Sequence, residues 1–249
     1  MVLLYQRFYL WLTLLMLGAC TLVSSDAETT SIPKRTTVVS GLLRPWSVAF
    51  LSEEEVLVTE KEGSLKRVNL VTGTQHVIQG FPKDLDNNPQ DDPCDNAGLF
   101  TVLLDPDYVN NAWVYVAYAA AGLGGSTTKV MRGQLQEDSL INVQTLLVAE
   151  PFSVDRFHYG GGMVFGSDGK LYVTVGERYF REIDQPPLPI AQDVRDRWGK
   201  IYRINADGSI PDDNPDLCGD GVAGVDAIGI STAQRISKSN EQAQIMFHK

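Results

Sequence analysis

Short apolar runs separated by turn residues dominate the chain from Leu42 onward. The runs are rich in Val, Leu, Tyr and Thr, and Gly, Asp, Asn or Pro interrupts each of them before a helical period can develop. No long stretch repeats its apolar positions at helical spacing. The pattern predicts an all-β fold built from many short strands.

The runs recur in three sets of three. The first run of each set ends at Phe50, Leu104 or Phe165, positions that are 54 and 61 residues apart, and an acidic or glycine-containing turn follows each time. A repeat of about 50 residues with several short strands is typical of a β-propeller, in which each repeat is one blade. A β-sandwich is the alternative, but it is not expected to repeat its strand order so regularly. We predict a propeller with about three recognisable blades, whereas about four to eight close the ring. The runs are 46–50, 56–59 and 64–68; 100–104, 113–118 and 129–135; and 162–165, 171–175 and 199–204.

The third set contains the residues best placed for chemistry. Its first two runs flank the turn Ser167-Asp168-Gly169, which predicts a hairpin. Folding about this turn brings residues near 160 and 177 to the same end, so His158 and Glu177 should lie side by side. A carboxylate that accepts one imidazole N–H fixes the tautomer and makes the other ring nitrogen more basic, as a general base requires. A purely structural histidine beside the glycines 160–162 is the alternative.

Composition narrows the choice of partners. The 249 residues, enough for one large domain or part of a larger one, include 31 Asp and Glu against 21 Lys and Arg. This excess of negative charge repels phosphate, so nucleic acid is not an expected partner. The stretch 83–98 is dense in carboxylates but lacks the ligand spacing of an EF-hand, so a solvated acidic loop is favoured over a calcium loop. No Cys-x-x-Cys or His-x-x-x-His spacing predicts a zinc site.

The first 20 residues are typical of a signal peptide. Arg7 precedes an apolar stretch, 8–18, that is too short to span a bilayer, and Leu17-Gly18-Ala19-Cys20 resembles a bacterial lipobox. Lipidation of Cys20 would anchor the mature chain to a membrane through a polar tether, 21–40; an ordinary cleaved signal is the alternative. Either reading predicts an exported, periplasmic or lipid-anchored protein. Export permits a disulfide between Cys94 and Cys218, which the sequence leaves open.

Six blocks of the sequence, taken in order, resemble the soluble quinoprotein sugar dehydrogenases, the glucose/sorbosone and aldose sugar dehydrogenase family. The resemblance implies a six-bladed propeller that binds pyrroloquinoline quinone (PQQ) and calcium. It implies oxidation of the anomeric carbon of an aldose to a lactone, with electrons passing to a downstream acceptor. The blocks are 45–50, 104–108, 158–161, 171–176, 199–204 and 208–215.

The resemblance also assigns residues. It implies that His158 is the base that takes the proton of the anomeric hydroxyl and that Glu177 orients it. Asn96 stands where the family has a substrate-side Gln, and Gly162 stands where Arg is usual. The family places its calcium ligands and quinone-binding cations in later blades, so no cofactor-binding residue and no metal ligand is assigned in this chain.

The segment 216–249 matches none of the later family motifs, and we hypothesise a frameshift near Ile228. We therefore expect blades 41–215 followed by an atypical tail. Such a chain by itself is expected to fold poorly, because it exposes strand edges and core side chains. The alternative functions are a non-catalytic exported binding module and, less in keeping with the motif order, calcium-dependent lactone hydrolysis.

Overall fold

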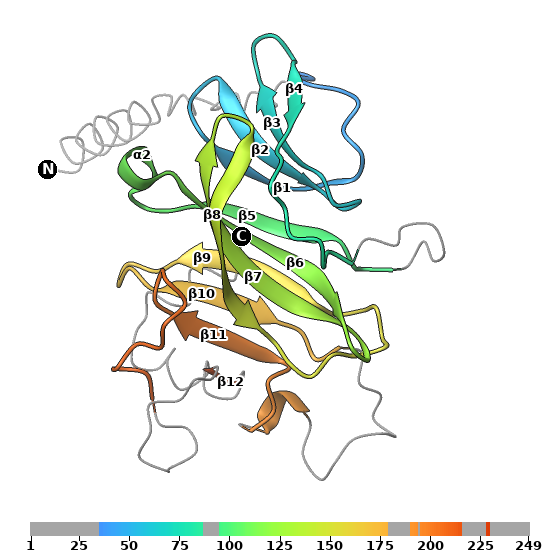
Figure 1. Cartoon of the computed structure of the whole chain (residues 1–249), viewed down its shortest axis with the longest axis vertical. Helices are drawn as coiled ribbons and strands as arrows, with labels where there is room; N and C mark the ends of the chain where they lie inside the picture. The colour runs from blue at the N-terminus through green and yellow to red at the C-terminus, as the bar shows by residue number, and fades with distance from the viewer. Residues whose placement is uncertain (1–34, 87–94, 179–189, 194, 216–227, 230–249) are drawn as a thin grey trace, which may run out of the picture. The chain divides into compact units, whose positions relative to one another are not determined.

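The structure is a computed structural model that describes residues 35–86, 95–178, 190–193, 195–215 and 228–229. Apart from the first three, these residues lie in the second of two compact units, 38–249. They form three antiparallel four-stranded sheets, each a meander of strands that neighbour one another in sequence (Figure 1). The prediction of an all-β fold is confirmed.

The sheets follow one another along the chain, and each corresponds to one of the predicted blades. Sheet A contains β1 (Pro45–Phe50), β2 (Glu55–Glu60), β3 (Leu65–Asn69) and β4 (Gln75–Val77). Sheet B contains β5 (Leu99–Leu104), β6 (Trp113–Gly122), β7 (Gly125–Gln136) and β8 (Ser139–Val148). Sheet C contains β9 (Gly160–Phe165), β10 (Leu171–Val175), β11 (Lys200–Ile204) and β12 (Ile228–Gly229). A short helix, α2 (Tyr108–Asn111), and a 3₁₀ turn, η2 (Ile190–Gln192), lie between strands.

The fourth strand of each sheet is absent from the sequence prediction. β4 is a polar segment, Gln-His-Val, and β8 leaves most of its central residues exposed, so neither carries a strong apolar alternation. β12 falls within the segment predicted to be an atypical tail, yet Ile228 pairs with Ile201 of β11. Sheet C therefore extends into that segment.

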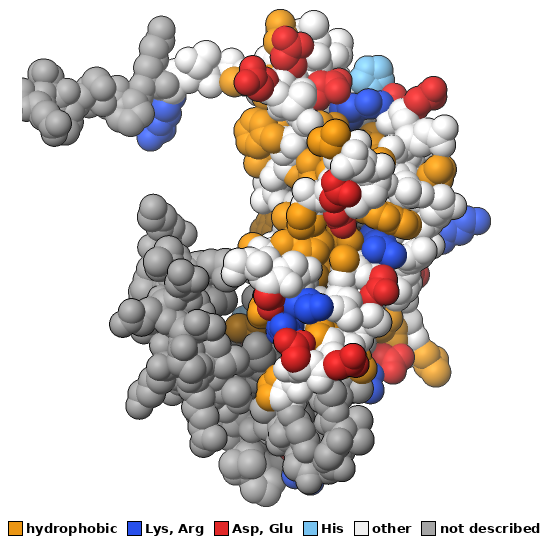
Figure 2. Space-filling view, turned by 90° about the vertical axis from the view of Figure 1, so that its left-hand side faces the viewer, with side chains coloured by type: hydrophobic (Ala, Val, Ile, Leu, Met, Phe, Trp, Pro, Cys, Tyr) orange, Lys and Arg blue, Asp and Glu red, His pale blue; other side chains and the backbone are white. Residues whose placement is uncertain are grey.

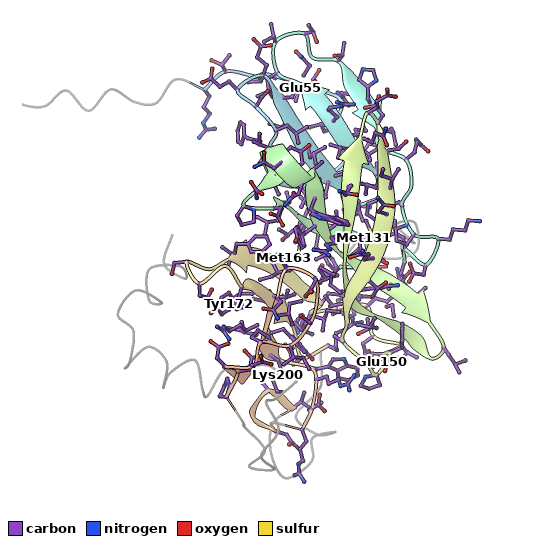
Figure 3. The ribbon with its side chains drawn as sticks, turned by 60° about the vertical axis from the view of Figure 1, so that its left-hand side comes forward. Glu55, Met131, Glu150, Met163, Tyr172 and Lys200 are labelled. Carbon is purple, nitrogen blue, oxygen red and sulfur yellow. The ribbon has the colours of Figure 1, made fainter. Side chains whose placement is uncertain are left out.

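The core has two layers, one on each side of sheet B. Along β6, Val114, Val116 and Tyr118 pack against sheet A, whereas Tyr115 and Ala117 pack against sheet C. Because both faces of this strand are buried, its sequence is almost continuously apolar. Figure 3 shows Met131 of β7 and Met163 of β9, which belong to the first and second layer respectively.

The first strands of the three sheets lie next to one another. β1 contacts β5, and β5 contacts β9. Aromatic side chains from β1, β5 and the residue before β9 form a series: the rings of Trp46 and Phe100 are 6.5 Å apart, and those of Phe100 and Tyr159 are 5.5 Å apart. This contact series connects sheet A to the segment that precedes β9, where His158 lies.

One apolar surface of β1 is exposed. Trp46, Val48 and Phe50 are 56%, 54% and 64% exposed, although strands of this kind normally bury such residues. Figure 2 shows hydrophobic side chains on the upper part of the molecule, where sheet A lies. This exposure agrees with the expectation that core side chains are uncovered, while poor folding of the chain stays a prediction.

Candidate active site

The hairpin of β9 and β10 positions the candidate residues. Its register pairs Phe165 with Leu171, Met163 with Val173 and Gly160 with Val175. At its turn the Gly166 N–H donates to the Lys170 carbonyl over 2.9 Å. The open end of the hairpin therefore carries both the residues before Gly160 and the residues after Val175.

His158 and Glu177 are in contact at this open end. His158 Nδ1 is hydrogen-bonded to Glu177 Oε1. The two side chains are 47% and 42% exposed, so a ligand can reach them from solvent. A carboxylate paired with one imidazole nitrogen is the arrangement that a general base needs. We call this pair the dyad.

Glycine allows the two segments of the dyad to approach so closely. The Gly176 N–H donates to the Tyr159 carbonyl over 3.0 Å. A Cβ on Gly176 would lie only 1.9 Å from the His158 carbonyl oxygen. At Gly160, φ is +77°, a conformation that favours glycine, and a Cβ there would lie 2.6 Å from the Thr174 carbonyl oxygen. At these two positions, therefore, only glycine lets the backbone segments of His158 and Glu177 pack against each other.

Asn96 lies on the segment that neighbours the dyad. Its backbone N–H donates to the Arg156 carbonyl over 3.0 Å, two residues before His158, and the Asn96 side chain is exposed. The adjacent Asp95 is buried; its carboxylate accepts hydrogen bonds from the Ala97 N–H and from Arg156 Nε. The structure thus brings the segments of Asn96, His158 and Glu177 together.

The described carboxylates of the acidic stretch are ion-paired rather than simply solvated. Asp84 Oδ2 lies 2.6 Å from Lys129 Nζ, and Asp86 Oδ2 lies 2.6 Å from Arg156 Nη1. Burial alone would lower the pKa of Arg156, but its hydrogen bonds to Asp86 and Asp95 outweigh that effect and raise the pKa. Composition cannot show such cations, because they come from distant parts of the chain; for 87–94, which lies outside the described residues, the solvated loop stays a prediction.

Arg178 is a part of the site that sequence reasoning did not identify. It follows Glu177, is only 1% exposed, and its Cζ lies 3.5 Å from the centre of the Tyr159 ring. Burial lowers the pKa of Arg178, although the nearby Tyr159 and Asp155 oppose that shift. The only sequence signal was a charged residue placed directly after the candidate acid.

Several predicted features lie outside the described residues: the signal peptide, Cys20, Cys94, Cys218 and most of 216–249. Gly162 is exposed, and its N–H donates to Thr174 Oγ1 over 2.9 Å. Among the described residues, no group of three His, Cys, Asp or Glu side chains is arranged to hold a metal ion. No helix in that part of the chain has the length and apolarity needed to cross a membrane.

Comparison with known proteins identifies the family. The model of the family described as Glucose / Sorbosone dehydrogenase matches residues 42–244, further than the sequence motifs alone extend. The chain belongs to the glucose/sorbosone dehydrogenase family. The predicted resemblance is therefore confirmed.

Curated and solved members of the glucose/sorbosone dehydrogenase family show how much of the fold is present. The aldose sugar dehydrogenase YliI of Escherichia coli K12 is 31% identical over 175 residues, covering 69% of this chain and 43% of YliI. A crystal structure of a glucose dehydrogenase, 32% identical, superimposes with a TM-score of 0.67 over 78% of this chain and 54% of that one. The PQQ-bound aldose sugar dehydrogenase of Streptomyces coelicolor, 27% identical, superimposes with a TM-score of 0.60 over 76% and 51%. The chain thus spans about half the length of these relatives, and its sheets are blades of the same β-propeller.

Proposed function

We propose that this protein is a quinoprotein oxidoreductase that oxidises the anomeric carbon of an aldose to a lactone, with PQQ as electron acceptor and calcium as a second cofactor. The observation that carries the proposal is the contact between His158 and Glu177 at a half-exposed position. Membership of a sugar dehydrogenase family supports the substrate class. The relative solved with PQQ supports the quinone.

The chemistry assigned to this chain is proton removal. Glu177 holds the Nδ1 side of the imidazole, so Nε2 would take the proton from the anomeric hydroxyl of the sugar. The carboxylate then stabilises the imidazolium that forms. Loss of this proton favours oxidation of the anomeric carbon to a lactone carbonyl; the hydride lost from that carbon would be accepted by the proposed electron acceptor, PQQ. Asn96, on the neighbouring segment, would bind a sugar hydroxyl through its side-chain amide.

The described residues do not by themselves fit PQQ, a tricarboxylate that needs several cationic donors. Arg156 is already neutralised by Asp86 and Asp95. Arg178 is only 1% exposed and so is not presented to a ligand. We therefore derive no step through the quinone and assign it no ligand here.

A pair of matched histidine variants tests the proposal. The protein is incubated with PQQ and calcium, and reduction of an electron-accepting dye by aldoses is measured. We expect His158→Gln to lower the rate at least about 100-fold, the usual contribution of a general base. His76→Gln is the control, because His76 Nδ1 lies 3.4 Å from Asp138 Oδ2 in a second exposed His–carboxylate pair on another sheet.

The outcomes separate the candidate functions. Equal rates for the wild type and His158→Gln would contradict the role of the dyad. Aldose binding without any dye reduction in the wild type would favour the alternative, a non-catalytic binding module. The departures at Asn96 and Gly162 are the features that favour this alternative.

A further inference from the structure

Arg178 joins the two backbone segments that carry the dyad. Its guanidinium stacks over the ring of Tyr159, the residue after His158, with Cζ 3.5 Å from the ring centre. Its Nη2 donates to the carbonyl of Asp155, three residues before His158. Arg178 itself directly follows Glu177. The side chain of Arg178, which belongs to the glutamate segment, therefore contacts the histidine segment both before and after His158 in the sequence.

The backbone at both segments adopts conformations that need such support. His158 has φ of +49° and Arg178 has φ of +65°, and both values lie in the left-handed region that residues other than glycine rarely adopt. Residues in this region persist where the surrounding structure holds them. The contacts of Arg178 with Tyr159 and Asp155 supply that restraint at the two ends of the dyad.

The platform under Arg178 is itself fixed. The Tyr159 hydroxyl lies 2.5 Å from Ser126 Oγ of β7, and the Tyr159 ring packs 5.5 Å from the Phe100 ring of β5. Tyr159 is only 2% exposed. Through Tyr159, the guanidinium therefore fixes the position of the dyad relative to sheet B, which is the central sheet of the described structure.

Stability alone does not account for an arginine at this position. Within the described part of the chain, Arg178 Nε and Nη1 are buried without a hydrogen-bond partner. Buried donors left unpaired are destabilising, and even complete buried ion pairs are often replaced by apolar residues of similar volume without loss of stability. An apolar side chain of similar length would avoid these two unpaired donors, but it would lose the cation–π contact with Tyr159 and the hydrogen bond to the Asp155 carbonyl. The guanidinium thus provides something other than packing.

We propose that Arg178 is a positioning residue that holds the imidazole of His158 against the carboxylate of Glu177. The stacked, planar guanidinium fixes Tyr159, and its Nη2 fixes the Asp155 carbonyl, so the intervening backbone presents His158 in one orientation. The catalytic consequence rests on the proposed function. The positioning itself rests only on the contacts described above.

The test measures the orientation of His158 directly, by NMR of the protein labelled with ¹⁵N-histidine. The chain has three histidines, and His158→Gln identifies the signals of His158. At about pH 8, where an ordinary imidazole is neutral, the ring nitrogens report which one carries the proton. In the wild type we expect a single tautomer with the proton on Nδ1 and slow exchange of that proton with water.

Two substitutions distinguish positioning from charge. Arg178→Met removes the charge and the donor, while Arg178→Lys keeps the charge but loses the planar stacking. We expect both to speed exchange of the His158 Nδ1 proton by about tenfold or more and to mix the tautomers. The urea midpoint of Arg178→Met should stay close to that of the wild type, because removal of the unpaired Nε and Nη1 donors offsets the loss of the Asp155 hydrogen bond. In dye reduction, both variants should lower kcat with little change in KM.

Arg132→Met is the matched control. Arg132 also stacks on an aromatic ring, with Cζ 4.1 Å from the Trp113 ring centre, and its Nη1 donates to the Ala206 carbonyl over 2.9 Å. Its described partners, Trp113, Gln144 and Ala206, lie outside the dyad segments, so its variant should keep the wild-type His158 signals.

Unchanged His158 signals in Arg178→Met would overturn the proposal, as would wild-type behaviour of Arg178→Lys. If the NMR effect appears but the wild type reduces no dye with any aldose, the positioning stands and the proposed function fails.

Discussion

Alanine at position 176 would test how tightly the two segments of the dyad pack. A Cβ on Gly176 would lie 1.9 Å from the His158 carbonyl oxygen and 2.6 Å from its carbonyl carbon. Ordinary van der Waals contact begins near 3.4 Å, so one segment must move by about 1.5 Å. Both atoms belong to the backbone, and no side-chain rotation can relieve the overlap.

The size of the effect follows from that displacement. Overpacking of this kind destabilises proteins by about 1–3 kcal/mol. A displacement of about 1 Å at a reacting group lowers a rate by about 100-fold. We expect Gly176→Ala to lower the urea midpoint, to disturb the His158 imidazole signals and to reduce dye reduction to that extent.

Gly73→Ala is the control for this prediction. Gly73 has φ of +75° and no atom within 4 Å of an added Cβ, so the cost there is only the backbone strain of about 1–2 kcal/mol. Gly73 lies between β3 and β4, and its variant should keep the wild-type imidazole signals and turnover. If Gly176→Ala kept the wild-type urea midpoint and imidazole signals, the close packing described above would be refuted.

Two further predictions concern other parts of the chain. Burial alone would raise the pKa of Asp105, but hydrogen bonds from Asn111, the Asp107 N–H and Tyr115 outweigh it and hold the pKa below its usual value. The stabilisation is therefore present above the unfolded pKa of about 3.9 and is lost as pH falls through the lower folded value. Asp105→Asn should lower the urea midpoint at neutral pH and weaken its pH dependence below about pH 4; an unchanged dependence would contradict this account. For the predicted lipobox, Cys20→Ser should abolish incorporation of labelled fatty acid and release the protein from the membrane fraction, whereas equal labelling would exclude Cys20 as the site.

The dyad could be predicted because its causes are local. The turn at Ser167-Asp168-Gly169 and the apolar residues of β9 and β10 set the register, and this register, shifted by one residue at a β-bulge between Val173 and Val175, brings residue 158 near residue 177. Asn96 was placed by a motif only. Its nearness to Arg156 depends on contact between two sheets, which no local pattern encodes.

The sequence could not predict where a charged residue is buried or an apolar residue is exposed. A charged residue after a strand is expected in solvent, yet Arg178 is buried because Tyr159 offers its ring from another segment. Conversely, alternation predicts a strand at β1 but does not say which face has a partner. The exposure of Phe50 therefore follows from the arrangement of sheets and not from its sequence.

The exposed strand β1 also has a consequence for the solubility of the protein. β1 lies at the edge of sheet A, so one side of its backbone has no strand partner within that sheet, and its apolar side chains are exposed. Two molecules must meet before such edges can pair, so the initial loss of soluble protein should follow second-order kinetics, with a rate rising as the square of concentration. Unfolding of single molecules is first order instead. Dilution should therefore preserve this chain at temperatures where a concentrated sample precipitates.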